Sequence, residues 1–183
     1  ATAPLYPFAD EAMDQSLCHT LWYVPGVNAA HCLAQILAEP TADNPFRNYK
    51  VVNVAGDSVS SQTSPLEEVR TAISTNERTI TLSCGRLTTG VSVPEWTAVF
   101  MLAGSADTGC AHYFQTIFRC QSPYREGIKA ECYTFDFSPT RTLTAIDQYI
   151  SNNLASTEHE ARVQKLTEFL YYCPTIVIDG GKR

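Results

Sequence analysis

The sequence TITLSCGRLTTGVSVP, residues 79–94, begins with a strand pattern and continues into a polar loop. Apolar and polar residues alternate over residues 79–84, and this period of two predicts a β-strand. The loop carries Thr88 and Thr89 between two glycines, which let the backbone approach a ligand closely. Threonine hydroxyls and loop amides are donors suited to phosphate oxygens. The stretch therefore predicts either a phosphate-binding loop or an ordinary connection between two strands.

A helix is predicted from about residue 107 to residue 122, after a second strand. Its apolar side chains recur at helical spacing, so Gln115 and Arg119 fall on a different, polar face. Arginine presents a planar fork of donors to a phosphate and stays charged at any working pH, while glutamine offers a donor and an acceptor. Pro123 should end this helix, which places Arg125 in the loop beyond it.

This succession of strand, loop, strand and helix resembles motifs V and VI of superfamily-two helicases, especially those of restriction-type motors. Such families commonly carry Leu-Thr-Gly-Phe-Asp-x-Pro, followed later by Gln-x-x-x-Arg-x-x-Arg. The matching positions of this chain are Leu87, Thr89, Gly90, Val91, Pro94, Gln115 and Arg119. Two positions differ, because Ser92 stands where aspartate is usual and Ser122 stands where motif VI usually has its second arginine.

The resemblance implies a role for each polar residue of the helix. Arg119 would act as an arginine finger, and Arg125 would replace the missing second arginine from the loop beyond the helix. Gly90, Gln115 and Arg119 would contact the nucleotide, which implies ATP with Mg²⁺ as the cofactor. No metal site is expected in this chain itself, because its histidines and cysteines show no metal-ligand spacing.

The same resemblance implies DNA as a partner, with Thr88 and Thr89 contacting its backbone. A phosphate-cradling Gly-x-x-x-x-Gly-Lys-Ser/Thr motif and an Asp-Glu pair at a strand end are both absent from the sequence. The chain is therefore expected to be the second RecA-like domain of a two-domain, ATP-hydrolysing motor, called the parent protein below. The N-terminal RecA-like domain of that parent would hold most of the ATP and Mg²⁺, and nuclease or methyltransferase domains are further candidate partners.

Strands alternate with helices along the chain, which favours an α/β fold with a mainly parallel sheet and helices on both faces. The strands are expected near residues 20–24, 50–55, 79–84, 97–103 and 129–136. Helices are expected over about residues 27–39 and 64–74, the second with Ser64 and Glu67 in the pattern of a capping box. Ligands of parallel sheets bind beyond the carboxyl ends of the strands, where the glycine-bracketed loop falls. With the motif resemblance, this indicates a RecA-like sheet of the P-loop NTPase type.

Three regions are expected along the chain. Residues 1–18 are predicted to be a linker, because prolines and an acidic pair stand there without a clear period. Residues 19–140 are predicted to form the RecA-like domain. Residues 141–183 are predicted to form a helical extension, with helices near 143–154 and 157–172 and an apolar stripe on the first.

Composition and charge limit the classes of function. The net charge of −6 argues against a free-standing nucleic-acid binder, which usually has a basic footprint. That objection weakens if the domain forms only one wall of a DNA channel and contacts the backbone through amides and hydroxyls. The seven cysteines are scattered, which favours a reducing cytoplasm. No apolar run approaches the ~20 residues of a membrane span, so no membrane partner is expected.

We interpret the chain as the C-terminal motor domain of an ATP-dependent DNA helicase or translocase from a restriction-modification enzyme. One alternative is a degenerate RecA-like module that binds a partner or nucleic acid without catalysis, which Ser92 and Ser122 favour. Another is a small-molecule transferase that binds a phosphorylated ligand at residues 88–90. Only the first interpretation requires a phosphate-cradling motif elsewhere in the parent protein.

Overall fold

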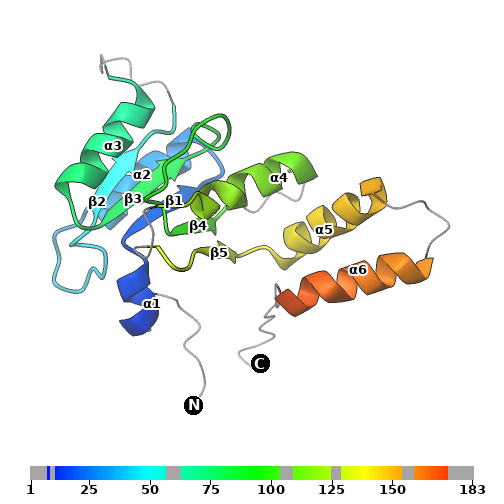
Figure 1. Ribbon diagram of the computed structural model, residues 1–183. Coiled ribbons are helices and arrows are strands. Elements are labelled where there is room, and N and C mark those ends of the chain that lie inside the picture. Colours follow the sequence, from blue (N-terminus) through cyan, green and yellow to red (C-terminus); the bar gives the residue numbers. More distant parts are fainter. Residues whose placement is uncertain are drawn as a thin grey trace.

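Five parallel strands form the sheet at the centre of the described part of the chain (Figure 1). The computed structural model describes residues 8, 11–56, 63–103, 109–124, 129–153 and 159–172. The strands are β1 (His19–Tyr23), β2 (Lys50–Asn53), β3 (Thr79–Ser83), β4 (Ala98–Met101) and β5 (Tyr133–Asp136), in the order β2-β3-β1-β4-β5. The predicted α/β fold with a parallel sheet is confirmed.

β1 lies in the middle of the sheet and pairs with β3 and β4. Trp22 is opposite Leu82 on one side and opposite Phe100 on the other. Because the paired strands all run in the same direction, their carboxyl ends meet at one edge of the sheet. The loop that follows β3 leaves the sheet at this edge.

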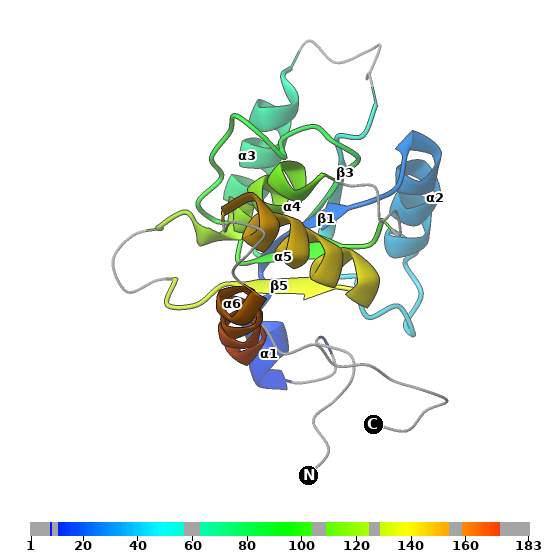
Figure 2. The same ribbon diagram turned by 90° about the vertical axis from the view of Figure 1, so that its right-hand side faces the viewer.

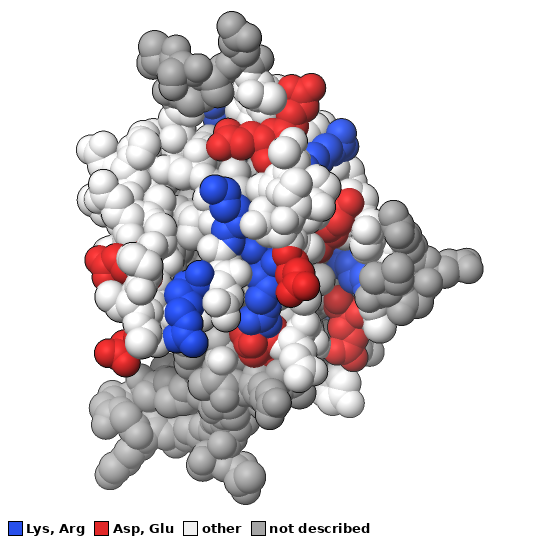
Figure 3. All heavy atoms as spheres, turned by 90° about the vertical axis from the view of Figure 1, so that its left-hand side faces the viewer, with Lys and Arg blue, Asp and Glu red and all other residues white. Residues whose placement is uncertain are grey.

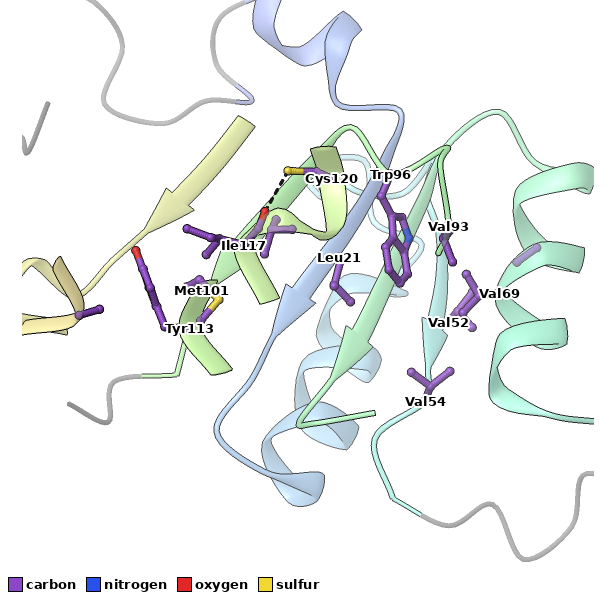
Figure 4. Packing of buried hydrophobic residues seen from close by; sticks show 13 residues of the cluster. Leu21, Val52, Val54, Val69, Val93, Trp96, Met101, Tyr113, Ile117 and Cys120 are labelled. Atoms are coloured by element: carbon purple, nitrogen blue, oxygen red, sulfur yellow. Dashed lines mark hydrogen bonds between the residues drawn. The ribbon is translucent and has the colours of Figure 1, made fainter. Parts of the chain in front are cut away.

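α3 (Pro65–Thr75) and α4 (Cys110–Ile117) cover one face of the sheet, and α2 (Val27–Leu37) lies on the opposite side (Figure 2). Side chains from α3 and α4 pack on strand residues in one hydrophobic cluster (Figure 4). Val93 and Trp96, from the connection between β3 and β4, belong to the same cluster and are both 0% exposed. The connection is therefore fastened to the core on its way to β4.

The first turn of α3 confirms the predicted capping box. The Ser64 hydroxyl accepts a hydrogen bond from the Glu67 amide at 3.3 Å, and the Glu67 carboxylate accepts one from the Ser64 amide at 3.1 Å. These bonds satisfy donors that would otherwise be unpaired at a helix start. The hydrogen bonds from Ser64 also lower the pKa of Glu67.

α4 is shorter than the predicted helix of residues 107–122. It ends at Ile117, and a 3-10 turn, Phe118–Gln121, continues the chain. Ser122 is extended, with a ψ of 127°, because the ring of the following proline disfavours the helical region for the preceding residue. Arg119 therefore lies in a tighter turn and not in the helix itself.

The linker predicted over residues 1–18 contains α1 (Glu11–Ser16). Leu17, directly after α1, is 0% exposed, and the Phe8 ring stacks on Phe100 with centroids 5.3 Å apart. Asp14 pairs with Arg78 at 2.8 Å. These contacts place the segment against the sheet face that α2 also covers. No periodic pattern in residues 1–18 indicated them.

α5 (Pro139–Asn153) and α6 (His159–Tyr172) form the predicted C-terminal helices. α5 packs beside α4, and the Phe114 ring of α4 contacts Tyr149 of α5 and Phe169 of α6, with centroids 5.5 and 6.3 Å apart. Arg141 at the start of α5 is only 1% exposed. α5 thus continues the core of the α/β domain.

Among the described helices, none is both long enough and apolar enough to cross a membrane.

Candidate functional site

The loop after β3 is shaped by hydrogen bonds among its own residues. The Ser83 hydroxyl donates to the Arg86 carbonyl and accepts from the Gly85 amide at 3.3 Å. The Thr88 hydroxyl donates to the Gly85 carbonyl at 2.6 Å. Gly85 has φ of +141° and Leu87 has φ of +61°, a conformation that is uncommon for a residue with a side chain. The loop therefore has a defined, tight conformation at the edge of the sheet.

Of the two threonines predicted to contact DNA, Thr89 is exposed and Thr88 is buried. The Thr88 hydroxyl is used inside the loop, so a contact between Thr88 and DNA would require the loop to open. Gly90 is exposed and has φ of +69°, a region that side chains rarely adopt, and an added Cβ would meet no atom within 4 Å. The positive φ, and not a lack of space, therefore accounts for a glycine at this position. Among the described residues, no other atom crowds the backbone next to Thr89 on this side.

Arg119 reaches from the turn after α4 to the loop after β3. Its Nε donates to the Gln115 carbonyl at 2.8 Å, and its Nη1 donates to the Val91 carbonyl. The Gln115 side chain is exposed and Arg119 is partly exposed. The fold thus joins the two stretches that resemble motifs V and VI, and it brings Arg119 and Gln115 together with the segment that follows Gly90.

The two positions that depart from the motif patterns are in contact with each other. The Ser92 hydroxyl donates to the Ser122 hydroxyl oxygen 3.2 Å away. The patterns place an aspartate and an arginine at these positions, so two neutral hydroxyls here take the place of two opposite charges. The contact between Ser92 and Ser122 gives a physical reason why both positions differ from the patterns together. An aspartate or an arginine at one of them alone would lack its oppositely charged partner.

Lys129 makes a further link between the two stretches. Its Nζ donates to the Pro94 carbonyl and to the Ser122 carbonyl, both at 2.9 Å. Burial lowers the pKa of Lys129, and neighbouring groups that include Glu95 oppose this effect. The sequence pattern does not single out Lys129, because a lysine shortly before β5 fits the spacing of neither motif.

Three cationic side chains, here called the cation cluster, surround residues 91–94. Arg119, Lys129 and Arg70 of α3 each donate to a backbone carbonyl of this segment, and the Arg70 contact is the longest at 3.4 Å. Among the ion pairs of the described residues, none involves a member of this cluster. The three cations thus converge on neutral backbone carbonyls of one short segment, while the carboxylates of Glu67 and Glu95 act on Arg70 and Lys129 without forming an ion pair among the described residues.

A hollow of about 620 Å³ lies next to the cation cluster. It is lined by His19, Arg70, Ile73, Ser74, Pro94, Glu95 and Tyr124. His19 begins β1, so the hollow opens at the amino end of this strand, the end opposite to the loop after β3. Burial lowers the pKa of His19 and so favours the neutral imidazole at pH 7. The negative charge of Glu95 acts in the opposite direction.

Arg125, predicted to replace the second arginine of motif VI, lies outside the described residues. Across the described ranges, no group of three or more His, Cys, Asp and Glu side chains is placed to hold a metal ion. The buried Cys120 thiol donates to the Ile117 carbonyl at 3.3 Å (Figure 4), and burial raises its pKa to about 12. Cys120 is therefore a packing group, since a reactive thiol requires a lowered pKa.

Surface charge is mixed on the side of the molecule that carries α3 and β2. Several lysine and arginine side chains lie near the middle of this face, with aspartate and glutamate side chains beside and around them (Figure 3). The overall charge is −6. A contact with nucleic acid on this side would have to use hydroxyls, amides and a few cations.

The sheet and its helices have a RecA-like fold, of the kind found in the second domain of helicases. The chain matches the second helicase domain of the DEAD-box protein Mss116p, in a structure with an RNA duplex, with a TM-score of 0.51 and 11% sequence identity. The match covers 89% of this chain and 65% of the other. At this level of identity the likeness defines the fold.

In sequence, the chain is 31% identical over 174 residues to a Mycoplasma pneumoniae protein described as the C-terminus of a type II restriction enzyme and methyltransferase. The match covers 90% of this chain, whereas the chain spans 23% of the length of that protein. No protein-family model matches the chain. The structural comparison thus defines a RecA-like fold, and the sequence comparison shows a similarity to part of a restriction enzyme and methyltransferase.

Proposed function

We propose that the chain is the C-terminal motor domain of an ATP-dependent DNA helicase or translocase belonging to a restriction-modification enzyme. The observation that carries the proposal is the hydrogen bond from Arg119 to the Val91 carbonyl, which couples the turn after α4 to the loop after β3. These two segments are the ones that resemble motifs VI and V. The likeness to a restriction enzyme and methyltransferase supports the choice of system.

The contacts of Arg119 are compatible with a role as an arginine finger, because among the described residues they involve no carboxylate. Its present acceptors are two neutral backbone carbonyls. A phosphate carries full negative charge and can accept two parallel hydrogen bonds from the planar guanidinium, so it attracts arginine more strongly than a neutral carbonyl does. A γ-phosphate presented by the N-terminal domain of the parent would therefore draw the guanidinium from the Val91 carbonyl, with Gln115 and the Gly90 backbone beside it.

The DNA contact is proposed for the exposed tip of the loop after β3. Thr89 and Gly90 are both exposed. The Thr89 hydroxyl and the Gly90 amide are donors suited to a phosphate oxygen. Such contacts position a protein on the backbone and carry little sequence information. This agrees with a chain that has a net negative charge and serves as one wall of a channel.

The 183-residue chain alone is expected to fold and to hydrolyse no ATP. An arginine and a loop cannot hold Mg-ATP in line for attack when the phosphate cradle belongs to another domain. The measurement is steady-state phosphate release with Mg-ATP, with and without duplex DNA. Turnover above background that persists through repeated purification would overturn the two-domain assignment.

Thr89→Val in the parent protein is expected to weaken the stimulation of ATP hydrolysis by DNA about 2- to 10-fold. The substitution keeps the size of the side chain and removes one hydrogen bond, worth about 0.5–1.5 kcal/mol. Thr41→Val is a matched control, because this threonine is also exposed but lies in the connection between α2 and β2. DNA-stimulated hydrolysis measured at several salt concentrations decides the matter, and an unchanged value would make Thr89 an ordinary loop residue.

A degenerate module that binds without catalysis is the second candidate. The neutral contact between Ser92 and Ser122 favours it, because the charged pair of the motif patterns is missing there. The full sequence of the parent separates the two candidates. A phosphate-cradling lysine motif and an Asp-Glu pair upstream support the motor, and their absence supports the module.

A further inference from the structure

We propose that Lys129 is a positioning residue that holds the loop after β3 against the turn carrying Arg119. The proposal rests on the proposed function, in which those two segments form one side of an ATP site. Lys129 belongs to neither motif and stands in the segment that leads to β5. Its role would be to set the distance between the two motifs.

The contacts of Lys129 span the junction on both sides. Its Nζ is 2.9 Å from the Pro94 carbonyl, at the end of the loop after β3, and 2.9 Å from the Ser122 carbonyl, at the end of the 3-10 turn. A single ammonium group therefore bridges two segments that are far apart in the chain. The bond from Arg119 to the Val91 carbonyl links the same two segments at a second point.

The side-chain contact between the segments is weak at this place. Ser92 and Ser122 share one hydrogen bond of 3.2 Å between neutral hydroxyls. A hydrogen bond from a charged donor to a carbonyl is stronger than one between neutral groups. Lys129 thus supplies, through the backbone, a charged link at a junction where the motif patterns would provide one through side chains.

Lys129 is partly buried and makes no ion pair among the residues that the structure describes. Holding a desolvated ammonium on two carbonyl groups costs free energy, which a purely packing role would not require. An apolar side chain of the same length would fill this space equally well. The amino group, and not the stem of the side chain, is therefore the part expected to matter.

The test uses the parent protein with Lys129→Met, which keeps the stem and removes the amino group. Amide hydrogen exchange of residues 91–93 and 118–122 is expected to speed up about tenfold or more, because both segments lose a tether. The kcat for DNA-stimulated ATP hydrolysis is expected to fall about 10- to 100-fold through misplacement of Arg119, while KM for ATP changes less than about twofold. Lys129→Arg should restore most of both properties.

Lys165→Met is the matched control, since Lys165 lies on α6, away from both segments in sequence, and pairs with Glu168 at 3.4 Å within the described part of the chain. If Lys129→Met prevents folding, Lys129→Gln takes its place, because it is polar and uncharged. Unchanged exchange in the two segments, the same changes in Lys165→Met, or a failure of Lys129→Arg to restore exchange would overturn the proposal. Faster exchange in Lys129→Met, in a parent protein that hydrolyses no ATP, would support the tether and refute the motor function.

Discussion

Replacing Arg119 with alanine in the parent protein is expected to reduce ATP hydrolysis by about 10³–10⁵-fold, while ATP binding stays near that of the unmodified protein. The positive charge of an arginine finger stabilises charge that develops on the transferred phosphoryl group, so its loss acts on the transition state. ATP binding would depend mainly on the other domain. The measurements are single-turnover hydrolysis and equilibrium binding of ATP, made on the same preparation.

Arg119→Lys separates charge from geometry in that experiment. Lysine keeps the charge but lacks the planar fork, so it is expected to restore little activity. Arg125→Ala is the companion variant, and a silent Arg125→Ala beside an inactive Arg119→Ala would show that one arginine serves. The opposing account makes Arg119 structural through its bonds to the Gln115 and Val91 carbonyls. It predicts that Arg119→Ala lowers thermal stability and impairs binding and hydrolysis together.

Replacing Arg141 with methionine is expected to destabilise the domain by about 3–5 kcal/mol, which for a chain of this size lowers Tm on the order of 10 °C. The Arg141 and Asp136 side chains are 1% and 8% exposed and form an ion pair. Arg141 also donates to the Met101 carbonyl at 3.0 Å, which ties the start of α5 to the end of β4. The variant would leave the Asp136 carboxylate buried without a cation. Thermal and denaturant unfolding measure the effect.

Arg162→Met is the control for that prediction. Its partner Asp147 lies 3.1 Å away, and the pair is much more exposed. Exposed pairs contribute about 0–1 kcal/mol, so little change is expected. The double variant Arg141→Met with Asp136→Asn should lose less stability than the sum of the single variants, because the uncompensated charge is removed. Equal stability of Arg141→Met and Arg162→Met would contradict the assigned role of the buried pair.

The sequence was most informative where a structure depends on neighbours within a few residues. The alternating pattern of residues 79–84 predicted β3, observed as Thr79–Ser83. Ser64 and Glu67 predicted the start of α3, because a capping box is a local exchange of hydrogen bonds. The alternation of β3 did not predict its burial. Its five residues are all buried, since helices cover both faces of a parallel sheet.

The candidate site was predicted only in part. The pattern of the two motifs selected Arg119, Gln115, Gly90 and Thr89, and the fold places these residues on two segments that touch. The difference between Thr88 and Thr89 was not predictable, because adjacent identical side chains were separated by a hydrogen bond inside the loop. Their predicted roles toward nucleotide and DNA stay predictions, and the variants above test the roles of Arg119 and Thr89.

By itself, the sequence determined the alternation of strands and helices, the helix cap and the two motif-like stretches. Periodicity shows which residues share a face of one element, and a cap is a hydrogen bond between near neighbours, so both can be recognised within a short stretch. The tertiary structure alone decided that Ser92 meets Ser122, that Lys129 bridges both segments, and that Asp14 of α1 pairs with Arg78. These contacts join residues that are distant in the chain. They form because burying apolar surface fixes the packing of whole elements, and only that packing determines which polar groups face each other.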